Sequence, residues 1–282
     1  MPYEILTRDP LGPQVVRNEI HAPLVARRCQ PGQFVILRVH ERGERIPLTI
    51  AAYDRARGTI TLIYQVVGKT TALLADKQAG ESLHDVAGPL GAPSDLEGLR
   101  KVAVIGGGLG CAIAYPQAGE LHRRGAYVDC IAGFRSRELV LLEPELRAVS
   151  DRLFVMTDDG SYGEKGLVTA KLEQLLQADA DYDAVIAIGP LVMMKFVSLL
   201  TKRYGVRTIV SMNPVMIDGT GMCGGCRIRV DGQTRFACVD GPDFDGHLVD
   251  FDDAIRRAGM YRAQEQEAME RHRCRLEGMD LG

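Results

Sequence analysis

The sequence of 282 residues predicts a β + α/β protein, with an N-terminal antiparallel barrel, a doubly wound parallel sheet and a C-terminal loop-and-hairpin segment. Short runs of β-branched residues separated by glycines fill the first hundred residues and favour the barrel. Apolar strands that alternate with helical stretches follow, and this alternation is typical of a doubly wound sheet. A stretch rich in Gly, Cys and Asp comes last. We expect three domains over residues 1–97, 98–210 and 211–282.

The barrel strands are expected where β-branched residues concentrate, over residues 15–21, 33–39 and 59–67. In the second part, continuous apolar runs predict strands buried on both faces at residues 102–105, 127–132, 153–157 and 184–188. Helical stretches at residues 112–124, 139–149 and 168–177 separate these strands. The charged, helix-prone segment from Asp252 onward is expected to be solvated or to clasp the domains, with docking to a partner as the alternative.

Charge and composition exclude several classes of protein. The chain has 34 basic and 37 acidic residues and a pI near 6.1, so it has no excess of positive charge for binding nucleic acid. The start of the chain lacks a basic stretch leading into an apolar core, and no apolar run is long enough to span a membrane. We therefore predict a cytoplasmic protein without membrane or nucleic-acid partners.

Three of the seven cysteines lie within sixteen residues and define a candidate metal site. Asp218 stands five positions before Cys223 and eight before Cys226, and Cys238 follows. These offsets match the plant-type [2Fe-2S] loop, C-x4-C-x2-C with a distant fourth Cys, except that Asp218 replaces the first cysteine. Interspersed glycines allow the close wrapping that such a cluster needs.

A hairpin is expected to bring Cys226 and Cys238 together. Alternating polar and apolar residues flank Asp231-Gly232, a strong turn signal, so the thiols at the two ends return to one place. The alternatives are a zinc site made by the three cysteines with His247, and a simple Asp-Gly turn at Asp218.

Glycine-rich turns after the predicted strands indicate a nucleotide site. Gly107, Gly108 and Gly110 follow the first strand and open a helix, where backbone N–H groups and the helix dipole favour a pyrophosphate. Asp159 and Gly189 come after two other strands, at the edge where ligands of such sheets bind. The second strand runs into Arg135 and Arg137 rather than an acidic residue. These arginines could contact a 2′-phosphate or be surface residues, so NAD and NADP both stay open.

In the barrel, Arg45 interrupts an apolar strand, and a fixed positive charge there calls for an anionic partner such as a flavin phosphate. Gly68, Thr70 and Thr71 surround Lys69 at a predicted helix start that suits the same pyrophosphate. A capping threonine beside an exposed lysine is the structural alternative.

Together these motifs resemble the ferredoxin reductase-like superfamily. They are R-I-P-L-T at 45–49, V-V-G-K-T-T at 66–71, G-G-G-L-G at 106–110, T-D-D-G-S-Y-G at 157–163, G-P-L-V-M-M at 189–194 and the cysteine loop. Within that superfamily the chain resembles the electron-transfer subunits of dihydroorotate dehydrogenases. It is more similar to the small subunits of electron-bifurcating NADH-dependent reduced ferredoxin:NADP oxidoreductases, also described as sulfide dehydrogenases. The resemblance implies four cysteine ligands in the former and one aspartate with three cysteines in the latter.

The resemblance implies FAD, a [2Fe-2S] cluster and NAD(H) as substrate, with electrons passing between them and no acid or base catalyst in the chain. The implied FAD contacts are Arg45, Pro47, Leu48, Thr49, Val66, Gly68 and Thr71. The implied nicotinamide nucleotide contacts are Gly107, Gly108, Gly110, Asp159 and Gly189. The implied cluster ligands are Asp218, Cys223, Cys226 and Cys238.

The implied partner is a larger, glutamate-synthase-like subunit that holds FAD and [4Fe-4S] clusters. Three other functions stay open at this point. They are an electron-transfer subunit of dihydroorotate dehydrogenase, a stand-alone NAD(P)H-dependent sulfide or polysulfide oxidoreductase, and a zinc-stabilised binding module.

Overall fold

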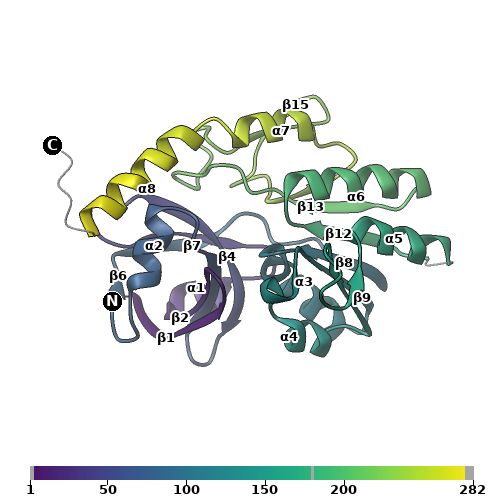
Figure 1. The fold of residues 1–282 in the computed structure, drawn as a ribbon, viewed down its shortest axis with the longest axis horizontal. Coiled ribbons are helices and arrows are strands. Elements are labelled where there is room, and N and C mark those ends of the chain that lie inside the picture. The colour runs from purple at the N-terminus through teal and green to yellow at the C-terminus, as the bar shows by residue number, and fades with distance from the viewer. Residues whose placement is uncertain (1–2, 179–180, 277–282) are drawn as a thin grey trace.

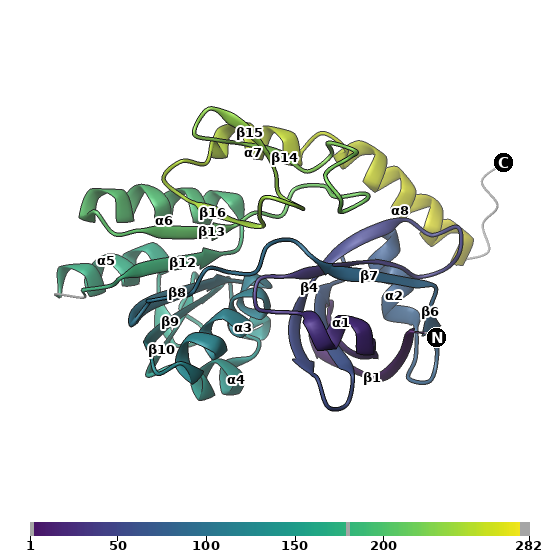
Figure 2. The same ribbon diagram turned by 180° about the vertical axis from the view of Figure 1, so that it is seen from behind.

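The computed structural model describes residues 3–178 and 181–276. Figure 1 shows the barrel and the parallel sheet side by side, with the C-terminal part of the chain lying across the top of both. The view from behind in Figure 2 shows the same arrangement. None of the helices within the described ranges has the length and apolar character needed to cross a membrane.

The barrel is a seven-stranded antiparallel sheet with the order β6-β1-β2-β5-β4-β3-β7. Its strands are β1 (Tyr3–Gly12), β2 (Val15–His21), β3 (Phe34–Arg38), β4 (Arg45–Asp54), β5 (Thr59–Gln65), β6 (Ser82–Leu83) and β7 (Asp85–Leu90). The outermost strands β6 and β7 are consecutive in the chain, so one short segment pairs with β1 at one end and β3 at the other and closes the sheet. Two helices, α1 (Pro23–Arg28) and α2 (Lys69–Asp76), accompany it.

The second sheet has the order β11-β10-β9-β8-β12-β13-β16. Its strands are β8 (Lys101–Gly107), β9 (Tyr127–Phe134), β10 (Arg152–Thr157), β11 (Glu164–Lys165), β12 (Ala184–Ile188), β13 (Thr208–Ser211) and β16 (Asp243–Asp245). The helical elements are α3 (Gly110–Arg123), the short 3-10 helix η1 (Arg137–Leu139), α4 (Glu143–Ala148), α5 (Val168–Gln177) and α6 (Leu191–Tyr204). The winding reverses between β8 and β12, and crevices at such a reversal bind ligands in sheets of this kind.

The two faces of this sheet are covered by different helices. Val102 and Val104 of β8 pack in one core with α3 and α4, whereas the intervening Ala103 packs in another core with α5 and α6. The first of these cores also contains barrel residues, among them Val15 and Ala51, because α3 lies between the sheet and the barrel.

After β13 the chain forms a long loop and the hairpin of β14 (Arg227–Val230) and β15 (Gln233–Phe236). It then returns as β16, which pairs antiparallel with β13 and adds an edge strand to the parallel sheet. Helices α7 (Phe251–Ala258) and α8 (Arg262–Leu276) follow, and α8 reaches back to α2 of the barrel. This path agrees with the expectation of a C-terminal helix that clasps the domains.

The predicted fold class is confirmed, and several predicted strands and helices match the structure to within one or two residues. The elements that the sequence reasoning missed include the strands β1, β7, β13 and β16 and the helices α1 and α6. The helix predicted over residues 139–149 is shorter, because only residues 143–148 are α-helical and a 3-10 turn precedes them.

A buried carboxyl group joins the three parts of the chain. Asp243 of β16 accepts hydrogen bonds from the Ser94 hydroxyl at 2.5 Å and from the Gln117 side chain of α3 at 3.2 Å. Its other oxygen, Oδ1, is buried without a partner in the described structure. Burial raises the pKa of Asp243, and its hydrogen bonds from Ser94 and Gln117 act in the opposite direction.

Gly110 should be required for packing at the start of α3. A Cβ atom added there would lie 2.2 Å from the backbone oxygen of Ile188. Gly110→Ala should therefore lower the free energy of unfolding by about 1–3 kcal/mol. Gly119→Ala, on the same helix, meets only a side-chain methyl at 3.6 Å and should raise it by about 0.5–1 kcal/mol. Denaturant unfolding measures both, and equal stabilities of the two variants would contradict the packing.

Candidate functional site

The loop between β13 and β14 lies directly on the barrel. Gly219 has a φ of +79°, and a Cβ atom there would lie 2.7 Å from both Ile36 Cδ1 of β3 and Leu90 Cδ1 of β7. Gly221, at φ +82°, is similarly close to Val239, at 2.9 Å. Glycine therefore allows the predicted cluster loop to approach the barrel more closely than any other residue would.

The predicted hairpin forms and brings two cysteines together. Its two-residue turn, Asp231-Gly232, has φ angles of +51° and +69°, as expected for a turn that matches the strand twist. Cys226 and Cys238 lie with their sulfur atoms 3.2 Å apart, and their exposed fractions are 1% and 2%. The strand register pairs Cys226 with Ala237 rather than with Cys238, so Cys238 reaches its neighbour from just beyond the ladder.

The other two predicted ligands lie in the exposed part of the loop. The Asp218 carboxylate accepts hydrogen bonds from the backbone N–H groups of Thr220 at 2.8 Å and Cys223 at 2.9 Å. These bonds lower the pKa of Asp218, because they stabilise its charged form. The Cys223 thiol is exposed. Over residues 3–178 and 181–276, no three His, Cys, Asp or Glu side chains gather around one point as a mononuclear metal site would need.

The thiol pair is electrostatically unusual. Burial, together with the adjacent Cys226 sulfur, raises the pKa of Cys238 to about 12, and the Gly221 N–H opposes this rise. The Cys238 thiol is therefore costly to ionise unless a cation shares its charge, and a coordinating metal removes that cost. The chemistry of this donor set fits a thiolate-bound metal centre.

A small apolar core fixes the cysteine pair onto the barrel. Cys226 and Cys238 pack with Phe34 and Ile36 of β3 and with Met216 of the loop. In the barrel, Pro47 of β4 lies opposite Ile36, and Thr49 lies opposite Phe34. Paired residues of antiparallel strands share a face, so Pro47 and Thr49 lie on the face of the barrel that the cysteine loop covers.

The remaining barrel candidates do not all share this face, because the side chain of Leu48 lies on the opposite side of β4 from Pro47 and Thr49. Leu48 pairs with Val35 and packs with the interior core of the barrel, and Arg45 is exposed at the start of β4. Gly68 is the N-cap of α2, and Thr71 in the first turn binds back to it, since its hydroxyl accepts hydrogen bonds from the backbone N–H groups of Val67 and Gly68, both at 3.0 Å. A Cβ atom added to Gly68 would meet no neighbouring atom within 4 Å, and Val66, two residues earlier, is half-buried.

Three of the predicted dinucleotide glycines meet at the reversal between β8 and β12. A Cβ atom on Gly189 would lie 3.1 Å from the backbone of Gly107, so the two strand ends are in close approach. Gly108 has a φ of +55° and open space where a side chain would point. Gly110 instead serves helix packing, as described above. The ends of β8 and β12 therefore present closely spaced backbone of a kind suited to a pyrophosphate.

The other nucleotide candidates lie after β9 and β10. Asp159 accepts hydrogen bonds from the Ser161 hydroxyl at 2.6 Å and backbone N–H at 2.9 Å, which lower its pKa. Arg137 lies over the Tyr162 ring, and its backbone N–H donates to the Ser161 hydroxyl. Asp159 thus orders the turn that follows β10.

The alternative of a zinc site with His247 as a ligand is wrong, because His247 does not lie with the cysteines. His247 Nε2 lies 3.0 Å from the Thr201 hydroxyl of α6, so its side chain packs on that helix rather than joining the cysteines. Sequence reasoning also missed Phe34 and Ile36 as neighbours of the cysteines. Phe34 and Ile36 are two positions apart on one strand, so their side chains lie on the same face, and they pair with Thr49 and Pro47 of the flavin motif. This alternation was the signal that could have identified them.

Residues 213–250 match the iron–sulfur cluster binding domain of dihydroorotate dehydrogenase B. A relative from Thermotoga maritima, described as a homologue of the electron transfer subunit of dihydroorotate dehydrogenase B (NAD(+)), is 44% identical over 268 residues. The alignment covers 95% of this chain and 94% of the relative.

Two solved structures place the fold. A chain in the structure of NADH-dependent reduced ferredoxin-NADP oxidoreductase, described in terms of flavin-based electron bifurcation, has a TM-score of 0.91 and 43% identity over 96% of this chain and 98% of its own. A ferredoxin NADP+ reductase from Neisseria gonorrhoeae has a TM-score of 0.57 over 73% of this chain and 91% of its own. At 18% identity the latter shows a shared fold alone.

The fold, the cysteine loop and these similarities define an iron–sulfur flavoprotein subunit that transfers electrons within a larger oxidoreductase. These findings confirm the predicted resemblance to electron-transfer subunits of this kind. They also confirm the prediction of an oxidoreductase subunit that uses FAD, an iron–sulfur cluster and NAD(H). The chain belongs to the family of dihydroorotate dehydrogenase B electron transfer subunits and their homologues.

Cys238→Ala should abolish the iron–sulfur cluster, because it removes one member of the buried sulfur pair. Cys130→Ala is the matched control, since Cys130 is equally buried, at 2% exposure, but lies in β9 away from the loop. Iron and acid-labile sulfide analysis of anaerobically purified variants measures the effect. Full iron content in the Cys238→Ala variant, or its loss from the control, would contradict the assignment.

Proposed function

We propose that this chain is the NAD-linked electron-transfer subunit of a flavin-based electron-bifurcating NADH-dependent ferredoxin:NADP oxidoreductase. The observation that carries the proposal is the buried pair of Cys226 and Cys238, packed on the barrel face that presents Pro47 and Thr49. The similarity of nearly the whole chain to the oxidoreductase chain described above supports it.

In this proposal Asp218, Cys223, Cys226 and Cys238 hold a [2Fe-2S] cluster as two pairs of ligands. Cys226 and Cys238 form the buried pair, and Asp218 and Cys223, joined by a hydrogen bond from the Cys223 N–H to the carboxylate, form the exposed pair. Such pairing suits a cluster of two irons, whereas a single zinc ion takes four donors around one point.

FAD would be held by Arg45, Pro47, Leu48, Thr49, Val66, Gly68 and Thr71. When bound, FAD exchanges a hydride with NAD(H) and single electrons with the cluster. Pro47 and Thr49 would orient its ring system on the face shared with the cysteine loop. The backbone N–H groups in the first turn of α2, at Lys69, Thr70 and Thr71, would bind its pyrophosphate.

NAD(H) would enter the crevice lined by Gly107, Gly108 and Gly189, with Gly110 keeping α3 close enough to aim its N-terminus at the phosphates. Asp159 would act indirectly, because it holds the turn at Ser161 in place beside the nucleotide. Arg137, stacked on Tyr162, would lie near the adenosine end. We assign NAD rather than NADP on the family resemblance.

Residues 1–97, 98–210 and 211–282 would be the FAD, NAD and cluster domains of this subunit. Its partner would be a larger, glutamate-synthase-like subunit that carries a second FAD and [4Fe-4S] clusters. The free thiols of the described cysteines suit the reducing cytoplasm, where we place the complex. The second candidate is a subunit of dihydroorotate dehydrogenase, favoured by the match over residues 213–250. Identification of the protein that co-purifies with the chain discriminates between the two.

Asp218→Cys should retain the cluster and shift its midpoint potential, because a thiolate donates more charge to iron than a carboxylate does. EPR-monitored redox titration measures the shift. Asp231→Asn, which changes the same charge on the hairpin turn, should leave spectrum and potential unchanged. An unaltered spectrum and potential in the Asp218→Cys variant would remove Asp218 from the coordination sphere.

The purified chain, loaded with FAD and cluster, should oxidise NADH with an artificial dye but should not reduce ferredoxin. Its sequence has one C-x2-C pair and no second cluster motif that could supply a low-potential centre. Anaerobic assays with the dye and with ferredoxin test this directly. Sustained ferredoxin reduction by the single chain would refute the proposal that the larger subunit, and not this chain, reduces ferredoxin.

A further inference from the structure

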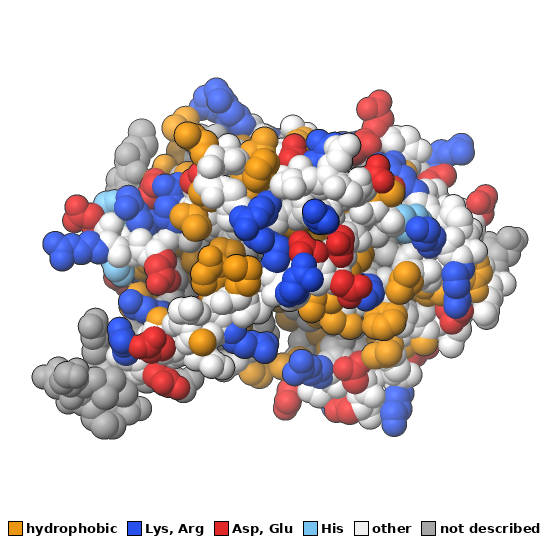
Figure 3. All heavy atoms as spheres, turned by 90° about the horizontal axis from the view of Figure 1, so that it is seen from above, with side chains coloured by type: hydrophobic (Ala, Val, Ile, Leu, Met, Phe, Trp, Pro, Cys, Tyr) orange, Lys and Arg blue, Asp and Glu red, His pale blue; other side chains and the backbone are white. Residues whose placement is uncertain are grey.

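A hollow of about 450 Å³ lies between the β14–β15 hairpin and α7 and has no part in the function proposed above. Its walls carry four arginines, Arg227 and Arg229 from β14 and Arg256 and Arg257 from α7. The arginines of β14 share one face of the strand, since Ile228 between them is buried. Figure 3 shows basic side chains beside a few acidic ones near the middle of the face that carries these elements.

The positive charge of the hollow is only partly compensated. Asp253 pairs with Arg256, and Asp250 caps α7 by accepting a hydrogen bond from the Asp253 N–H. Arg227 and Arg257 donate to the backbone carbonyls of Gly224 and Gly225, at 3.0 Å and 3.4 Å, which are neutral partners. Arg229 forms no salt bridge within the part of the chain that the structure describes. Three guanidinium groups therefore remain without a carboxylate of their own.

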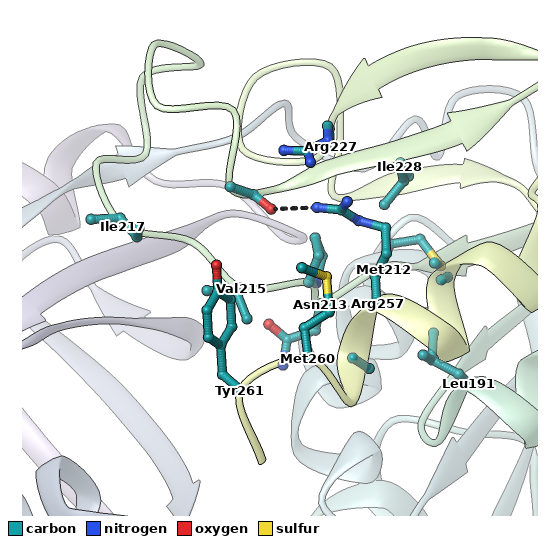
Figure 4. A pocket seen from close by; sticks show the side chains of 14 residues that line it. Leu191, Met212, Asn213, Val215, Ile217, Arg227, Ile228, Arg257, Met260 and Tyr261 are labelled. Carbon is teal, nitrogen blue, oxygen red and sulfur yellow. Dashed lines mark hydrogen bonds between the residues drawn. The ribbon is translucent and has the colours of Figure 1, made fainter. Parts of the chain in front are cut away.

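An apolar cavity of about 100 Å³ adjoins the hollow, and Arg227, Ile228 and Arg257 line both. Figure 4 shows Arg257 reaching toward the Gly225 carbonyl above the side chains of Val215, Met260 and Tyr261. The Tyr261 side chain is half exposed, at 51%, so the cavity can be entered from solvent past an aromatic ring.

We propose that the hollow and the cavity together bind a nucleoside phosphate, with the phosphate among the arginines and the base in the apolar cavity. Guanidinium groups bind phosphate oxygens bidentately, and aromatic or apolar walls suit a planar base. The volume of the hollow, about 450 Å³, lies within the range of small-molecule sites. The arginine hollow shares no lining residue with the glycine turns at Gly107 and Gly189, whereas the apolar cavity includes Leu191, two residues after Gly189.

An occupant of this site would touch the cluster loop. Arg227 directly follows the candidate ligand Cys226, and Arg257 is hydrogen-bonded to Gly225, which lies between Cys223 and Cys226. Binding would compete for these arginines and thereby alter the surroundings of the loop. The EPR spectrum of the cluster is therefore a second readout of occupancy, besides direct binding.

The test is equilibrium binding of AMP, adenosine and inorganic phosphate to the loaded chain, with NADH in excess to fill the dinucleotide crevice. AMP should bind more tightly than either fragment. Arg229→Gln and Arg257→Gln should each weaken AMP binding by about tenfold or more, as expected for loss of a charge-assisted hydrogen bond. Arg235→Gln, on the neighbouring strand and bonded to the Gln233 side chain, should leave it unchanged.

Absence of AMP binding to the unmodified chain would overturn the proposal. So would equal affinity in the Arg229→Gln variant, which loses no internal hydrogen bond and should fold normally. Binding of phosphate as tight as that of AMP would reduce the site to an anion site and contradict the role of the cavity. If the variants instead weaken association with the larger subunit and AMP does not bind, the hollow is a protein interface and the nucleotide assignment is wrong.

Discussion

The small apolar core formed by Phe34, Ile36, Met216, Cys226 and Cys238 is the contact on which the rest of the structure depends. It presses the cysteine hairpin against β3, while the opposite partners of Phe34 and Ile36 on β4 belong to the candidate flavin motif. Electron transfer between a flavin and a cluster requires that the two be held close and at a fixed separation. Rigid packing of the cysteines onto a barrel strand provides such a separation without any catalytic side chain.

The parallel sheet is tied to this unit from two sides. Helix α3 packs between the sheet and the barrel, and β16 returns from the cysteine segment to pair with β13. Where these connections meet, the buried Asp243 carboxyl is held by Ser94 and Gln117. The hydrogen bonds of this buried carboxyl group can form only when the three parts of the chain are in one relative position. They therefore favour a fixed position of the dinucleotide site relative to the barrel.

Local sequence signals predicted much of this architecture. The hairpin followed from Asp231-Gly232, the doubly wound sheet from apolar runs such as Val102-Ala103-Val104-Ile105, and the candidate cluster ligands from their spacing. What could not be predicted depends on contacts between distant segments. The edge strand β16 has only three residues, Asp243 looks like any surface acid in sequence, and the arginines of β14 and α7 meet only in the folded chain. Gly110 likewise reads as a phosphate contact, yet its neighbour is the Ile188 carbonyl.

The most direct test of the central claim is the cofactor content of the chain purified without oxygen, by iron, sulfide and flavin analysis with a visible spectrum. A cluster on the barrel face predicts two irons and two sulfides for each FAD, with flavin and iron–sulfur absorption that bleach together on addition of NADH. A colourless protein, or one with stoichiometric zinc and no flavin, would contradict the claim.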